Sequence, residues 1–90
     1  MITKEKLKIF KRYAGNVDGW ARSASKKERS LIGDDDWYAI DALMQDLFLV
    51  KKGVTSLEFR SALNDKLKEN CDDEKTIAQL QKLAESIDNR

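Results

Sequence analysis

Residues 33–53 read GDDDWYAIDALMQDLFLVKKG and form the most apolar stretch of the chain. The aspartates at 34–36 stand at its front, where carboxylates cap a helix and interact well with the positive end of its dipole. Lys51 and Lys52 stand at its back, where positive charge is favoured, and Gly53 can adopt the positive φ that often ends a helix. The stretch therefore predicts a helix bounded by Gly33 and Gly53.

Apolar side chains cover more than half of the circumference of this helix, at about 100° per residue. They are Trp37, Ile40, Leu43, Met44, Leu47, Phe48 and Val50. A helix that is apolar over so wide an arc needs neighbours on two or three sides. We expect it to be the central helix of an all-α domain.

The remaining arc of the helix is acidic. Its members, called the acidic face below, are Asp34, Asp35, Tyr38, Asp41, Gln45 and Asp46. One interpretation is a solvated surface whose aspartates cap the helix and aid solubility. Another is a docking surface with Tyr38 as its anchor, because aromatic residues dominate the energetics of interfaces. A third is a homodimer that buries Tyr38 and the neighbouring Leu49.

Helical spacing predicts further helices on both sides of the central one. Thr3 is the expected N-cap of a first helix that contains Leu7 and Phe10 and stops at Gly15-Asn16. Residues 16–33 leave two alternatives, either one helix over about residues 19–32 or a loop followed by a short helix. In the second alternative, Ser25 and Glu28 form a capping box, in which each satisfies the other's backbone N–H.

Residues 54–59, VTSLEF, predict the start of the next helix. Thr55 and Glu58 match a capping box, and Val54 and Phe59 match a hydrophobic staple. The turn at Gly53 is short, so we expect this helix to run antiparallel to the central one and to end near residue 70. The last helix is expected to follow Asp72 or Asp73, with an apolar stripe at Ile77, Leu80, Leu83, Ala84 and Ile87.

Together these segments predict a compact antiparallel bundle of four to five short helices. A chain of 90 residues with 41% apolar residues can bury one core, so residues 1–90 are expected to form a single helical domain. The overall charge of +1 conceals a strong segregation, with a net charge of +6 over residues 1–30 and −5 over residues 31–50. A chain with this polarity can bind a charged partner while staying near neutrality.

The basic residues leave a nucleic-acid partner open. Arg22, Lys26, Lys27 and Arg29 form a cluster that either contacts nucleic acid or folds against the aspartates at 34–36. The helix–turn–helix around Gly53 is a poor DNA reader, because its first helix is acidic and phosphates would repel it.

The composition argues against catalysis. The chain has no histidine and one cysteine, and its four glycines are isolated rather than gathered in a phosphate-binding loop. The aspartates at 34–36 lack the alternating spacing of a calcium loop. We therefore expect no enzyme activity, no metal site and no cofactor. No apolar run approaches the roughly 18 residues of a membrane span, and no signal peptide is recognisable, so we expect a cytoplasmic protein without membrane association.

The segment DALMQDLFLVKKGVTSLEF, residues 41–59, resembles the helical hairpin of small bacterial immunity proteins of the colicin D immunity type. That resemblance implies a non-catalytic inhibitor that docks its acidic face onto the basic cleft of a nuclease toxin. Complementary charge of this kind raises the association rate and selects the partner. The alternative is a small nucleic-acid-associated or regulatory protein that uses the basic N-terminal third.

Overall fold

The computed structural model describes residues 1–71 and 73–86. These residues form six helices: α1 (Lys4–Arg12), α2 (Val17–Ser23), α3 (Lys26–Leu31), α4 (Asp34–Lys51), α5 (Leu57–Asn70) and α6 (Glu74–Ser86). Within these residues there is no strand, only an isolated bridge between Ile2 and Cys71. The all-α bundle is confirmed, with one helix more than expected.

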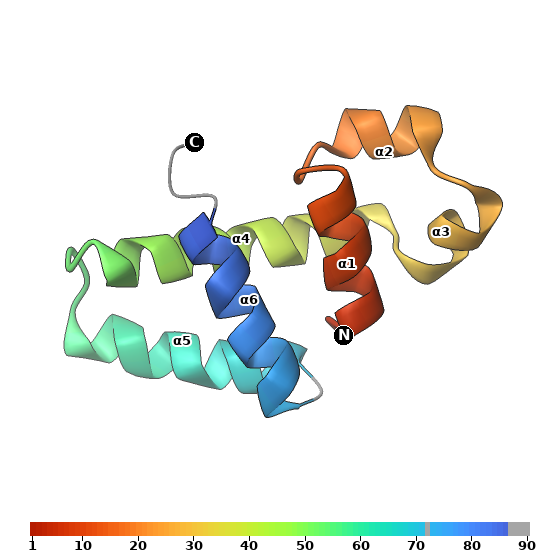
Figure 1. Ribbon diagram of the computed structural model, residues 1–90. Coiled ribbons are helices and arrows are strands. Elements are labelled where there is room, and N and C mark those ends of the chain that lie inside the picture. Colours follow the sequence, from red (N-terminus) through yellow and green to blue (C-terminus); the bar gives the residue numbers. More distant parts are fainter. Residues whose placement is uncertain (72, 87–90) are drawn as a thin grey trace.

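Helix α4 is the centre of the bundle, as its wide apolar arc predicts (Figure 1). The chain turns at Gly53, whose φ is +74°, and α5 returns beside α4 in the antiparallel direction. Helices α1 and α6 pack on each other and on the same side of α4. Helices α2 and α3 lie at the end of the molecule where α4 begins. None of the helices described is long and apolar enough to cross a membrane.

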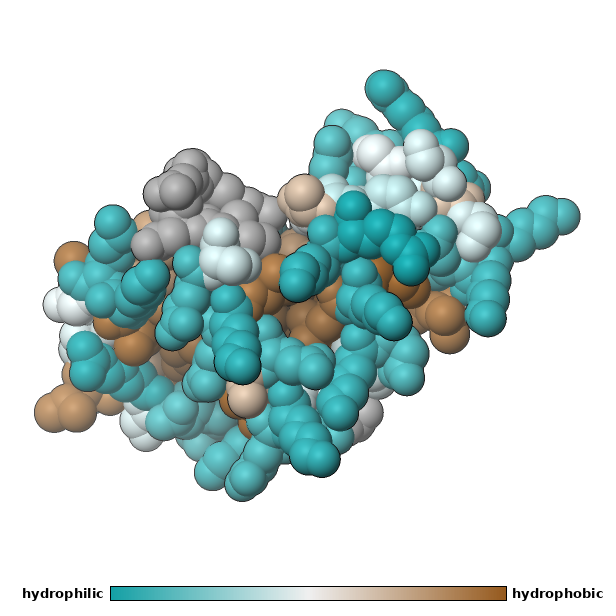
Figure 2. Space-filling view, in the orientation of Figure 1, coloured by the Kyte–Doolittle hydropathy of each residue, from teal (hydrophilic) through white to brown (hydrophobic). Residues whose placement is uncertain are grey.

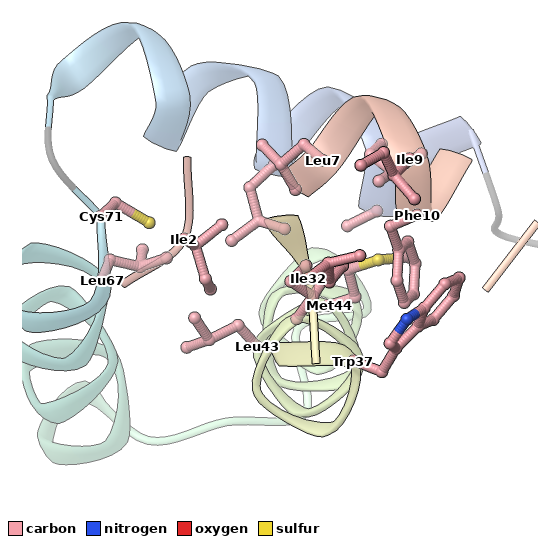
Figure 3. Close-up of a cluster of buried hydrophobic side chains, with 14 of the residues drawn as sticks. Ile2, Leu7, Ile9, Phe10, Ile32, Trp37, Leu43, Met44, Leu67 and Cys71 are labelled. Carbon is pink, nitrogen blue, oxygen red and sulfur yellow. The ribbon is translucent and has the colours of Figure 1, made fainter. Parts of the chain in front are cut away.

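The core extends through the whole bundle (Figure 3). At the start of α4, Trp37 packs on Phe10 of α1 and Trp20 of α2, with ring centroids 4.7 Å and 5.7 Å away. Near the other end of the cluster, Ile2 and Cys71 are buried where the N-terminal segment meets the link between α5 and α6. The Ile2 amide donates to the Asn70 carbonyl at 2.6 Å, which ties the first residues of the chain to the end of α5.

Residues 16–33 follow neither of the two expected alternatives, because they form two short helices. The side chain of Asn16 accepts a hydrogen bond from the Gly19 amide and caps α2, so Gly19 lies within a helix rather than in a turn. The capping box of Ser25 and Glu28 at the start of α3 is confirmed. Helix α1 ends earlier than Gly15, since Tyr13 is its C-cap and Ala14 already has a positive φ.

The predicted capping box at Thr55 is wrong. Helix α5 begins one residue later than that box requires, and the Ser56 hydroxyl accepts from the Phe59 amide at 3.1 Å. Thr55 instead accepts a hydrogen bond from the Arg60 guanidinium. Val54 is 69% exposed, so the predicted staple between Val54 and Phe59 does not form.

The predicted caps at the two ends of the chain are confirmed where the structure describes them. Thr3 accepts from the Lys6 amide at the start of α1. Asp73 accepts from the Thr76 amide at 2.7 Å in the first turn of α6. Asp72, the other candidate cap, and Ile87, the end of the predicted stripe, lie outside the described residues.

Candidate protein-binding face

Helix α4 carries all six residues of the acidic face on the arc away from the core. The side chains of Asp34, Asp35 and Gln45 are exposed, and those of Asp41 and Asp46 are half-buried. Tyr38 is 66% exposed although it is one of the larger apolar side chains in the chain. An aromatic ring surrounded by carboxylates, and not used by the core, is the unusual feature of this surface.

The packing of α4 explains why this arc stays open. Trp37, Ile40, Leu43 and Met44 are buried and face the neighbouring helices. The residues of the acidic face alternate with these buried residues along the sequence. At about 100° per residue, their side chains project from the side of α4 that faces away from the core. The Gln45 amide donates to the Asp41 carboxylate at 3.0 Å across one turn of the helix. This contact is a local restraint on two side chains of the face.

Asp36 is structural and does not belong to the acidic face. Its carboxylate accepts from the Gly33 amide at 2.8 Å and pairs with the Lys6 ammonium at 3.0 Å. Burial disfavours the charged form of Asp36 most strongly, but the Gly33 amide and the Lys6 ammonium together outweigh burial and lower its pKa. Asp36 therefore fixes the start of α4 and ties it to α1.

The basic cluster of α2 and α3 does not fold against the aspartates at 34–36. Arg22, Lys26 and Lys27 are exposed, and among the described residues none of them pairs with those carboxylates. Arg29 donates to the Ala21 carbonyl and so links α3 to α2. The base that pairs with an aspartate at the start of α4 is instead Lys6, which lies on α1.

Glu28 has a connecting role that helical spacing did not reveal. It accepts from the Tyr13 hydroxyl at 2.9 Å and from the Arg12 guanidinium at 2.8 Å, so it joins α3 to the end of α1. The Ser25 amide, with help from the Tyr13 hydroxyl, lowers the pKa of Glu28. The same hydrogen bond raises the pKa of Tyr13, because the phenol donates to a carboxylate. These groups hold α1 and α3 together.

A second exposed feature lies where α4 turns into α5. Val54 and Leu57 are 69% and 84% exposed, and Leu49 at the end of α4 is 41% exposed. Figure 2 shows hydrophobic atoms protruding at this end of the molecule. Leu49 lies beside the acidic face. Leu49, Val54 and Leu57, called the apolar tip below, therefore adjoin the acidic face. The expected staple had assigned Val54 to a packed contact, and for that reason the tip was missed.

Within residues 1–71 and 73–86, no three acidic or cysteine side chains come together as a possible metal site. The Cys71 thiol is buried rather than presented to solvent.

Comparison with protein-family models, with curated proteins and with solved structures gave no match.

Proposed function

We propose that this chain is a non-catalytic protein-binding module, an immunity or antitoxin-like inhibitor that acts in the cytoplasm. Its acidic face docks onto a basic partner, a toxin with a nucleic-acid-cleaving cleft. The observation that carries the proposal is the exposure of Tyr38, at 66%, in the middle of a carboxylate surface.

The charges of the acidic face support a nuclease-type partner. Asp34, Asp35, Asp41 and Asp46 supply four carboxylates along one side of a helix, without a lysine or arginine among them. A cleft that binds phosphates is lined by positive charge, and a row of carboxylates matches it in the way that a nucleic-acid backbone does. Complementarity of this kind steers association and excludes wrong partners.

Tyr38 supplies what charge alone does not. Surface ion pairs contribute little affinity, whereas a buried aromatic anchor can contribute 2 kcal/mol or more. Its ring is free of the core, so docking removes apolar area from water without disturbing the fold. The carboxylates then govern the rate of encounter, and the ring governs how long the complex lasts.

Photocrosslinking from position 38 identifies the partner directly. Replacing Tyr38 with a photoreactive phenylalanine derivative should capture a basic protein in the native cell, and the same derivative at Lys66 should not. Lys66 is the matched control because it is exposed on α5, outside the acidic face. Capture of the same protein from both positions, or of none from position 38, would contradict the proposal.

Association and dissociation rates with the captured partner then separate charge from anchor. Asp41→Lys should slow association, and more so at low salt, because like charges then approach each other. Tyr38→Ala should speed dissociation about 30-fold, which corresponds to about 2 kcal/mol. Asp65→Lys, at an exposed position of α5 outside the acidic face, is the control. If both face variants bind like wild type, the acidic face is only a solvated surface.

A further inference from the structure

Helices α1 and α6 form a groove whose charge is opposite to that of the acidic face. Its volume is about 760 Å³. Four lysines line it, three from one side of α1 and one from α6: Lys4, Lys8, Lys11 and Lys82. Among the described residues that line it, Glu5 alone is acidic. The buried side chains of Leu7 and Leu83 contribute its apolar surface.

The groove lysines make no close ion pair with the described residues, although the Thr76 amide, with help from nearby Lys4, lowers the pKa of the Asp73 carboxyl. All four are exposed, and none forms an ion pair with a carboxylate of the described residues. Lys6 and Arg12, which lie on the same helix, do pair with Asp36 and Glu28. Helix α1 thus separates its bases into two that stabilise the fold and three that face the groove.

The spacing of the groove lysines is regular. Positions 4, 8 and 11 fall on one side of a helix, so their ammonium groups form a row along α1. Lys82, which lies on α6 near the end of the sequence, lines the same groove. Figure 2 shows this side of the molecule, with hydrophilic atoms over α1 and α6 and hydrophobic atoms between them. A row of point charges beside an apolar surface suits an extended polyanion whose charges repeat along a chain.

From this geometry we infer that the α1–α6 groove binds the phosphate backbone of a single-stranded nucleic acid, without regard to sequence. A flexible single strand can bring successive phosphates to the lysines of both helices, whereas a rigid duplex holds its phosphates on the outside of a cylinder and reaches fewer of them. Lysine contacts to phosphates release counterions and carry the affinity. Among the described residues that line the groove there is no aromatic side chain for stacking and no arginine for a bidentate base contact, so the contacts expected from them are to the backbone.

The acidic face does not prevent this binding. Helices α1 and α6 cover the core-facing side of α4, and the acidic face occupies the opposite side. Charges on opposite sides of the molecule that lie further apart than the roughly 8 Å Debye length at physiological salt are largely screened from each other. No groove residue belongs to the acidic face, so this inference is independent of the proposed function.

Fluorescence anisotropy with a labelled oligothymidylate of about 12 nucleotides tests the inference. Each lysine–phosphate contact to a single strand contributes about −0.7 to the slope of log affinity against log salt, so four contacts predict a slope of about −2.8. Affinity should then fall about 50-fold between 50 and 200 mM salt. The double variant Lys4→Gln/Lys8→Gln should lose about half of that slope, and Lys82→Gln about a quarter.

Two further variants make the test specific. Lys26→Gln/Lys27→Gln removes the same charge from exposed positions of α3 outside the groove, and should keep the wild-type slope. Glu5→Gln removes the one carboxylate of the groove and should tighten binding several-fold. A gain of affinity cannot arise from unfolding. Circular dichroism melts check that each variant is folded.

The outcomes that overturn the inference are distinct. The groove is not the binding site if no binding occurs at 50 mM salt. The same conclusion follows if the groove variants leave the slope of log affinity against log salt unchanged. An equal loss in the α3 control pair moves the contact to Lys26 and Lys27. Displacement of the oligonucleotide by polyglutamate as readily as by unlabelled oligothymidylate would show a docking site for acidic proteins instead. Equal affinity for a duplex of the same length would contradict the single-strand geometry.

Discussion

Single hydrogen bonds decide where the helices of this chain begin. Thr55 and Ser56 are adjacent hydroxyls, and either could cap α5 on local pattern alone. The structure selects Ser56, whose hydroxyl accepts from the Phe59 amide. Ser56→Ala should therefore lower the free energy of unfolding by about 1 kcal/mol, and Thr55→Ala should change it by less than about 0.5 kcal/mol. Urea denaturation measures both losses. A larger loss for Thr55→Ala than for Ser56→Ala would show that Thr55, and not Ser56, caps α5.

A second residue-scale prediction concerns Asp36 and acid. Burial opposes its ionisation, but the Gly33 amide and the Lys6 ammonium lower its pKa below the unfolded value of about 3.9. A carboxyl with a lowered pKa stabilises the fold above the unfolded pKa, and this contribution is lost as pH falls through the folded pKa. Asp36→Asn should therefore be less stable than wild type at pH 7, by about 1 kcal/mol, and the two proteins should converge near pH 2.

Urea melts of Asp36→Asn across this pH range provide the measurement. Glu28 and Asp73 also have lowered pKa values, from the Ser25 and Thr76 amides respectively, so wild type and variant both lose stability in acid. The informative quantity is the difference between the two curves. Asp65→Asn, at an exposed position of α5, is the control and should run close to wild type. A difference between wild type and Asp36→Asn that does not change with pH would show that the ionisation of Asp36 contributes nothing to stability.

Helix α4 has a buried side, which we expect to stabilise the fold, and an exposed side, which we expect to bind the partner. Leu43 is 4% exposed and Leu49 is 41% exposed on the same helix, so one chemical change probes both sides. Leu43→Ala should cost about 2–5 kcal/mol, the range for truncation in a packed core. Leu49→Ala should cost less than about 1 kcal/mol. Equal losses in urea denaturation would mean that α4 is packed all round and presents no open face.

The helices that could be predicted from sequence are those whose signals are local. Helix α4 carries its acidic start, its apolar period and its glycine stop within one segment, and the acidic face followed from that period. The local capping box at Ser25 does predict the start of α3, but α2 is missed because Asn16 is interpreted as a helix stop, whereas its side chain caps the next helix. The α1–α6 groove could not be predicted either, since Lys82 joins the lysines of α1 only through folding.

For the molecule as a whole, the core and the charge have different distributions. One hydrophobic cluster links residues from the N-terminal segment to α6, so stability is shared among distant parts of the chain. Charge is instead divided between the acidic face of α4 and the groove of α1 and α6. Because neither charged surface contains core residues other than Leu7 and Leu83, substitutions on them can alter binding while leaving the fold intact.

The continuous core predicts that residues 1–90 unfold in one step. Trp20 and Trp37 report on the end of the bundle formed by α1, α2 and the start of α4, whereas circular dichroism reports on all helices. The two probes should give coincident urea transitions if the chain is one cooperative unit. Leu63 lies on α5, outside the tryptophan region, yet belongs to the same cluster. Leu63→Ala should therefore shift the tryptophan transition and the helical transition by the same amount, about 2–5 kcal/mol. If the helical signal moves to lower urea while tryptophan fluorescence keeps its wild-type midpoint, α5 unfolds separately and the single-domain prediction is wrong.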